Sequence, residues 1–67
     1  MYRIEHLHDS VHHQTSRTAF ENKDSARVAM AKIFARCYGT YPIVERTFDS
    51  FSFRSKNTLH TLRVVEN

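Results

Sequence analysis

Four histidines near the N-terminus are the residues of this 67-residue sequence whose types and spacing best suit chemistry. His6 and His8 alternate along one segment, and His12 and His13 follow in the next. On a β-hairpin His6 and His8 would share a face and His13 would come near them, an arrangement that could hold a metal ion. Structural zinc, however, takes four ligands in a closed shell. We therefore expect exposed hairpin histidines, with no metal and no other cofactor.

Catalysis would require an activated nucleophile or a phosphate-binding loop. Cys37 falls on the apolar stripe of a predicted helix, near its negative C-terminal end, so we expect a buried and inert thiol. The serines are scattered, and none lies in a glycine-bounded nucleophile turn. Gly39 is the single glycine, which excludes a glycine-rich phosphate loop. We expect no enzymatic activity and no catalytic residue.

The single cysteine excludes an intramolecular disulfide and the paired-cysteine zinc motifs. No apolar run approaches the roughly 20 residues of a membrane span, and the first residues lack the apolar core of a signal peptide. We therefore expect a cytoplasmic protein that does not enter a membrane.

Basic residues exceed acidic ones, with a net charge of +3 and a pI near 9.4, which is compatible with an anionic partner. Several cations lie off the apolar stripe of the predicted helix, and others accompany the later phenylalanines. This helix face could contact an acidic protein surface or phosphates, or it could simply be solvated. The candidate partner-binding residues are Lys23, Arg27, Lys32, Arg36, Arg46 and Arg54.

The element that must position most of these cations is a helix, predicted from about Lys23 to Tyr38. Apolar residues recur at helical spacing from Ala26 to Cys37 and form one stripe, which must be buried. Asn22 is the predicted N-cap, and Gly39 offers a left-handed residue after the helix.

Segments rich in β-branched and aromatic residues predict strands on both sides of the helix. Tyr2 to His8 and Val11 to Phe20, joined by a turn at Asp9-Ser10, predict an N-terminal hairpin. Further strands are predicted from Ile43 to Phe48 and from Leu59 to Val65.

Between those two later strands, the phenylalanines do not alternate as one continuous strand requires, because Phe48 would point to one face and Phe51 and Phe53 to the other. Either Asp49-Ser50 is a tight turn or the strand has a bulge there, and we favour the turn. A second turn is predicted at Lys56-Asn57. We expect at least two of three phenylalanines, Phe48, Phe51 and Phe53, in the core, although aromatics among cations also resemble base-stacking surfaces.

The predicted fold class is α+β: a small antiparallel sheet, made of the N-terminal hairpin and two to three later strands, with the helix packed on one face. Residues 1–67 are predicted to form a single domain.

A hairpin ending near Thr18-Ala19-Phe20, an alanine-rich helix opening at Asn22 to Ala26, and aromatic strands from Tyr41 to Phe53 form a layout that resembles small phage-encoded inhibitors. Among these are anti-CRISPR proteins directed at Cascade-type complexes and the small inhibitors of host RNA polymerase from T-odd phages. The resemblance implies an inhibitor that occupies a protein or nucleic-acid-binding surface of a host complex, and it transfers no site residue.

The leading functional hypothesis is therefore a non-enzymatic inhibitor or adaptor that binds a host protein complex, itself one that handles nucleic acid. The alternative is a small basic nucleic-acid-binding module. A homodimer formed by pairing edge strands is a third, structural option for so short a chain.

Overall fold

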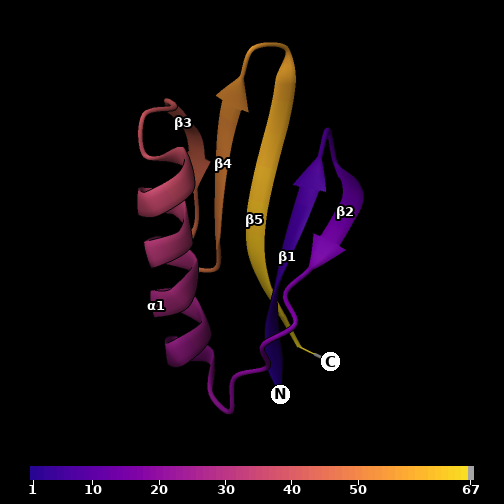
Figure 1. The fold of residues 1–67 in the computed structure, drawn as a ribbon, viewed down its shortest axis with the longest axis vertical. Coiled ribbons are helices and arrows are strands. Elements are labelled where there is room, and N and C mark those ends of the chain that lie inside the picture. Colours follow the sequence, from indigo (N-terminus) through magenta and orange to yellow (C-terminus); the bar gives the residue numbers. More distant parts are fainter. Residues whose placement is uncertain (67) are drawn as a thin grey trace.

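The computed structural model describes residues 1–66, in which one sheet is covered on one face by a helix (Figure 1). Within these residues the sheet is antiparallel and has five strands in the order β2-β1-β5-β4-β3. The strands are β1 (Tyr2–His8), β2 (Val11–Thr15), β3 (Ile43–Arg46), β4 (Ser50–Ser55) and β5 (Thr58–Glu66). The predicted α+β class, with an N-terminal hairpin and a helix on one face, is confirmed.

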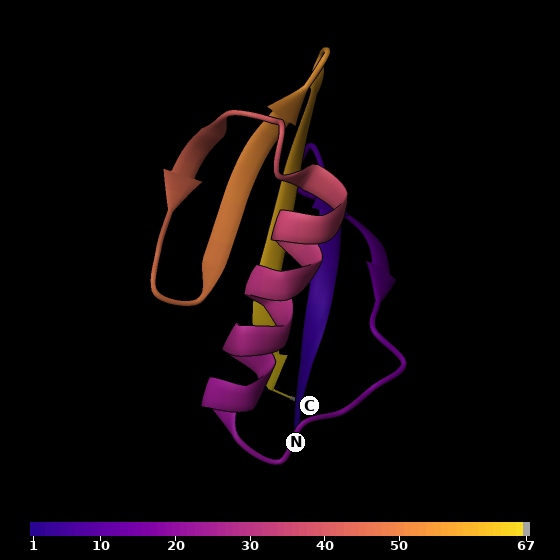
Figure 2. The same ribbon diagram turned by 60° about the vertical axis from the view of Figure 1, so that its left-hand side comes forward.

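The helix α1 (Lys23–Ile33) continues directly into a π-helical turn, η1 (Phe34–Tyr38), so the predicted helical range is confirmed. It runs along the sheet in front of the central strands (Figure 2). Asn22 is the N-cap, and its side-chain oxygen accepts a hydrogen bond from the backbone N–H of Ser25 at 2.8 Å. Gly39 has a right-handed φ of −62°, so the predicted left-handed position is wrong. Neither helical segment of residues 1–66 is long and apolar enough to cross a membrane.

The π turn changes which side chains face the sheet at the end of the helix. Because a π turn contains one extra residue, the inward position after Phe34 falls on Tyr38 and not on Cys37. The Tyr38 ring packs against the buried Phe53 ring, with 4.7 Å between centroids. Cys37 is exposed, so the prediction of a buried thiol is wrong.

Two of the predicted turns occur where expected. Asp9 and Ser10 have φ values of 50° and 68°, which suit a two-residue hairpin turn of type I′. Lys56-Asn57 joins β4 to β5. The second strand is shorter than predicted, because the chain after β2 leaves the hairpin and Phe20 returns only as an isolated bridge to Tyr2.

The turn between β3 and β4 lies at Phe48-Asp49, one residue before the predicted position. It is closed by a hydrogen bond of 3.0 Å from the Thr47 N–H to the Ser50 carbonyl. This turn resolves the change of phase, because Phe48 stays outside while Phe51 and Phe53 enter the core. Two of the three phenylalanines are therefore buried, as predicted.

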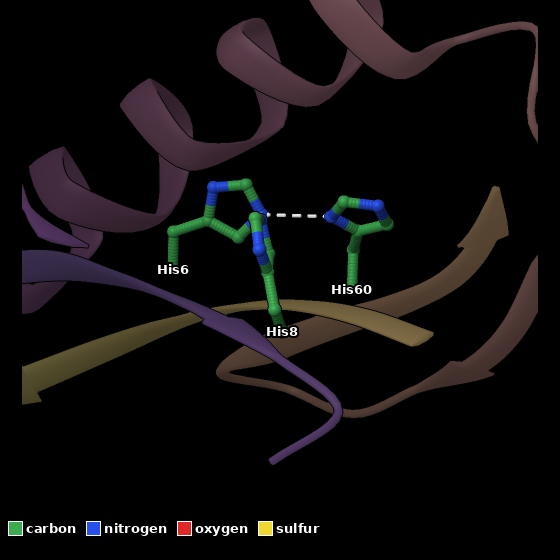
Figure 3. A group of neighbouring side chains, drawn as sticks. All are labelled: His6, His8 and His60. Atoms are coloured by element: carbon green, nitrogen blue, oxygen red, sulfur yellow. Dashed lines mark hydrogen bonds between the residues drawn. The ribbon is translucent and has the colours of Figure 1, made fainter. Parts of the chain in front are cut away.

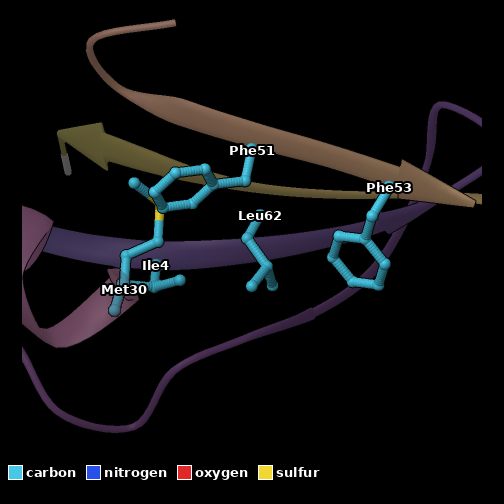
Figure 4. Packing of buried hydrophobic residues seen from close by; sticks show 5 residues of the cluster. All are labelled: Ile4, Met30, Phe51, Phe53 and Leu62. Carbon is cyan, nitrogen blue, oxygen red and sulfur yellow. The ribbon is translucent and has the colours of Figure 1, made fainter. Parts of the chain in front are cut away.

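The core lies between α1 and the helix-covered face of the sheet (Figure 4). Its buried cluster comprises Ile4, Met30, Phe51, Phe53 and Leu62. The strand members alternate with outward residues, because successive side chains of a strand point to opposite faces. Met30 is the helix residue at the centre, with 2% of its surface exposed.

Met30→Ala should therefore destabilise the protein by about 2–5 kcal/mol, since it leaves a cavity between helix and sheet. Val28→Ala is the matched control, because Val28 is 55% exposed on the same helix and should change stability by less than about 0.5 kcal/mol. Urea unfolding followed by circular dichroism measures both. Equal midpoints for the two variants would contradict the core assignment.

Candidate functional site

Three histidines from two neighbouring strands converge on the helix-covered face of the sheet (Figure 3). His6 and His8 alternate along β1, and His60 lies directly opposite His8 on β5. One nitrogen from each ring lies within 4.8 Å of the others. His6 Nε2 and His60 Nδ1 are 3.0 Å apart and share a hydrogen bond in which one nitrogen donates and the other accepts.

A fourth histidine, His13, approaches these three from β2. We call His6, His8, His13 and His60 the histidine cluster. The register between β1 and β2 shifts after His6, and this irregularity leaves His13 beside His6 and His8. The His13 ring stacks on that of His8, with 4.0 Å between centroids. Its neighbour His12 lies on the opposite face, where Nδ1 is 2.7 Å from a carboxylate oxygen of Glu5.

Aromatic rings enclose part of the cluster. Tyr38, placed inward by the π turn, lies 5.8 Å from the His6 ring, and Phe53 stacks on His60 at 5.1 Å between centroids. Only 8% of His6 is exposed, whereas His60 is half-buried and His13 is exposed. The cluster therefore has an apolar wall under the helix and opens toward β2.

This environment favours neutral imidazoles. Burial, together with the neighbouring His8, His60 and His13, lowers the pKa of His6 to about 4. Burial also lowers the pKa of His60. A neutral imidazole keeps a nitrogen lone pair, which is the form that ligates metals.

The prediction of exposed hairpin histidines is wrong for His6 and His8, because Tyr38 at the end of the helix packs against His6 and other histidine rings pack against His8. It is correct for His12 and His13, which are exposed. His60 was not a candidate in the sequence analysis. Its only signal was its place in a strand-forming segment, and its contact with His8 depends on the register of β1 against β5, which the sequence does not display.

The candidate cations Lys23, Arg27 and Arg46 gather around the β3–β4 turn. Lys23 Nζ is 2.8 Å from Asp49 Oδ2, and this hydrogen bond raises the pKa of Lys23. The Arg27 guanidinium lies 3.5 Å above the Phe48 ring, and its Nε donates to the Phe48 carbonyl at 2.8 Å. Arg27, Arg46 and Phe48 line a shallow pocket between α1 and the turn.

The other three candidates lie elsewhere. Lys32 and Arg36 are exposed on the helix, and within residues 1–66 neither makes an ion pair. Arg54 alternates with the buried Phe53 and therefore points to the sheet face away from the helix. The structure thus brings together three of the six predicted partner-binding residues and separates the remaining three.

Large apolar side chains are exposed along one edge of the sheet. All residues of β3 are exposed, and Ile43, Val44 and the following Phe48 expose 44%, 56% and 66% of their surfaces. We call Tyr41, Ile43, Val44 and Phe48 the β3 edge. The opposite edge strand, β2, has the largely polar sequence Val-His-His-Gln-Thr. Sequence reasoning identified the β3 strand but did not place it at an edge.

Comparison with known proteins gives no match, whether with family models, with curated proteins or with solved structures.

The metal-free protein should lose stability in mild acid because of His6. Its pKa is about 4 in the folded protein against an ordinary 6.5, so the unfolded chain binds more protons between these values. Stability is therefore highest above pH 6.5 and falls as the pH drops toward 4, by at most roughly 3 kcal/mol from this group. The groups that face His6 are His8, His13, His60 and Tyr38, and His60 adds a loss in the same direction.

Urea unfolding at a series of pH values, with a chelator present, measures this loss. His6→Leu should flatten the stability profile between pH 6.5 and 4, whereas His12→Gln, on the opposite face, should leave that slope in place. An unchanged slope in His6→Leu would contradict the assignment of the acid sensitivity to His6.

Proposed function

We propose that this chain is a non-enzymatic binding protein that inhibits a larger protein assembly by occupying one of its surfaces, as small phage-encoded inhibitors do. The observation that carries the proposal is the β3 edge, where large apolar side chains are exposed on a strand with one unpaired side. Unprotected apolar edge strands promote aggregation, so natural proteins usually shorten, charge or cover them. A short chain that keeps this edge apolar gains a site for adding a strand from a partner.

The contrast between the two sheet edges supports this location. Both β2 and β3 are outer strands. β2 exposes one apolar side chain, Val11, among polar residues, while β3 exposes Ile43 and Val44 in succession before the charged Glu45 and Arg46. Edge polarity is a common defence against unwanted pairing. The two edges therefore differ in how much adjacent apolar surface a partner could cover.

The charges beside the β3 edge define the partner's chemistry. Arg46, the last residue of β3, is exposed and lies over the Phe51 ring at 5.3 Å. Lys23 and Arg27 already form ion pairs with Asp49 and Asp24. Arg46 is therefore the cation of this group that can pair with a partner's carboxylate without breaking an existing ion pair. We assign the edge to an extended segment of a partner protein that carries apolar residues and at least one carboxylate.

Nucleic acid is the second candidate partner, because the exposed Phe48 ring carries the Arg27 guanidinium on its face, and aromatic rings combined with cations are typical of base-stacking sites. The two candidates differ in their behaviour toward free nucleic acid. A protein-binding inhibitor need not bind random single-stranded DNA or RNA, whereas a nucleic-acid module should bind it with an affinity that falls steeply with salt. Titration of both nucleic acids at low and high salt separates them.

Val44→Lys should reduce partner binding at least about tenfold, since a lysine at an edge strand opposes strand addition and 1.4 kcal/mol already corresponds to tenfold. Val11→Lys is the matched control, because Val11 is 68% exposed on the opposite edge. Proteins captured from a bacterial lysate by the parent are identified by mass spectrometry, purified, and titrated against both variants by calorimetry.

Binding that survives Val44→Lys, or that Val11→Lys weakens equally, would contradict the β3 edge as the binding surface. Sedimentation of the isolated parent tests a second copy as the occupant. A parent dimer that Val44→Lys dissociates would show that the edge serves self-association and would overturn the partner proposal.

A further inference from the structure

The histidine cluster is not explained by the binding function, and it is an unusual use of core space. A hydrogen bond between His6 and His60 accounts for two of the rings. Within residues 1–66, His8 and His13 have no hydrogen-bond partner for their side chains, yet both rings lie against His6. His8 is half-buried and His13 is exposed, so their unpaired ring nitrogens can be reached from solvent.

We propose that His6, His8 and His60 bind one divalent transition-metal ion of the zinc class. Nitrogen ligands of tetrahedral zinc lie about 2.0–2.1 Å from the ion, which places them roughly 3.3 Å from one another. The 3.0 Å between His6 Nε2 and His60 Nδ1 is close to this value. The remaining nitrogens lie within 4.8 Å, so small side-chain rotations close the set around an ion.

The His8 ring packs edge-on against both other rings of the proposed site. The His8 ring is nearly perpendicular to both partners, with interplanar angles of 80° to His6 and 79° to His60. In Figure 3 the His8 ring is seen edge-on, next to the hydrogen bond that joins His6 and His60, and its centroid is 4.6 Å from that of each. His13, whose ring stacks on that of His8, lies on the exposed side of the cluster, from which a water molecule or a further side chain would complete the coordination.

The donor set selects the metal class. Neutral imidazole nitrogens suit zinc, copper and nickel, whereas magnesium and calcium prefer oxygen ligands. The nearby Tyr38 and Phe53 rings limit access of water from the helix side.

This proposal replaces the expectation from the sequence that no metal is bound. It is independent of the β3 edge, because the cluster is built from β1 and β5 whereas the proposed partner surface is on β3. Failure of either proposal therefore leaves the other standing.

The test is calorimetric titration of zinc into metal-stripped protein at neutral pH, with magnesium as the non-binding comparison. One zinc ion should bind per chain. At a free zinc concentration roughly 100 times the Kd, the melting temperature should rise by about 10 °C or more.

His8→Gln and His60→Gln should each abolish the thermal shift and weaken zinc binding by at least tenfold, about 1.4 kcal/mol. His12→Gln is the matched control, because His12 is exposed on the same hairpin but on the opposite face of the sheet, and it should bind zinc as the parent does. Circular dichroism with a chelator present establishes that each variant is folded. Cobalt substitution adds a spectroscopic readout, since a tetrahedral nitrogen site gives strong visible absorption that both ligand variants should lose.

The proposal would be overturned by no zinc binding by the folded parent, by zinc binding that His8→Gln and His60→Gln retain, or by one zinc ion bound per two chains with formation of a dimer. Equal loss of binding in His12→Gln would also overturn it, because that result would assign the ion to the exposed hairpin histidines.

Discussion

The antiparallel pairing of β1 with β5 is the contact on which the rest of the structure depends. It joins the two ends of the described chain, with Tyr2 opposite Glu66 and His8 opposite His60. On the face away from the helix, Arg63 Nε lies 2.6 Å from a carboxylate oxygen of Glu5, its direct neighbour across the two strands. A slip of one residue would turn the core side chains of β1 to the wrong face, so burial and charge pairing specify the same register.

That pairing also constrains how the protein folds. The hairpins β1–β2 and β4–β5 close over turns of two residues and need only local contacts. The contact between β1 and β5 must instead bridge most of the chain, and its loop-closure entropy is lost before the core can form. The helix then covers both strands, since Met30 packs against Ile4 and Leu62 in one cluster.

Local patterns were enough to predict much of this fold. The apolar stripe from Ala26, the cap at Asn22 and the turn at Asp9-Ser10 each carry their information in a few consecutive residues, and each is confirmed. The π turn was missed because it changes the helical period without a distinct residue signal. Tyr38 therefore took the inward position that the spacing had given to Cys37.

The candidate site was less predictable, because it depends on contacts between distant segments. The pair His6 and His8 is visible as strand alternation, but His60 is separated from His6 by 54 positions and joins only through strand register. Likewise, the exposure of Ile43 and Val44 follows from strand order, which decides that β3 is an edge. Sequence patterns identify which residues form strands, while the order of those strands determines which residues meet.

The histidine cluster acts on the same contact that closes the fold. A metal ion held by β1 and β5 would link residues 54 positions apart, and cross-links that close long loops restrict the unfolded chain the most. Because the link lies at the His8–His60 end of the strand pair, it would fix the register directly under Tyr38 and the end of the helix. The ion would therefore stabilise the scaffold from the side of β1 and β5 and leave the β3 edge, on the far side of β4, available to a partner.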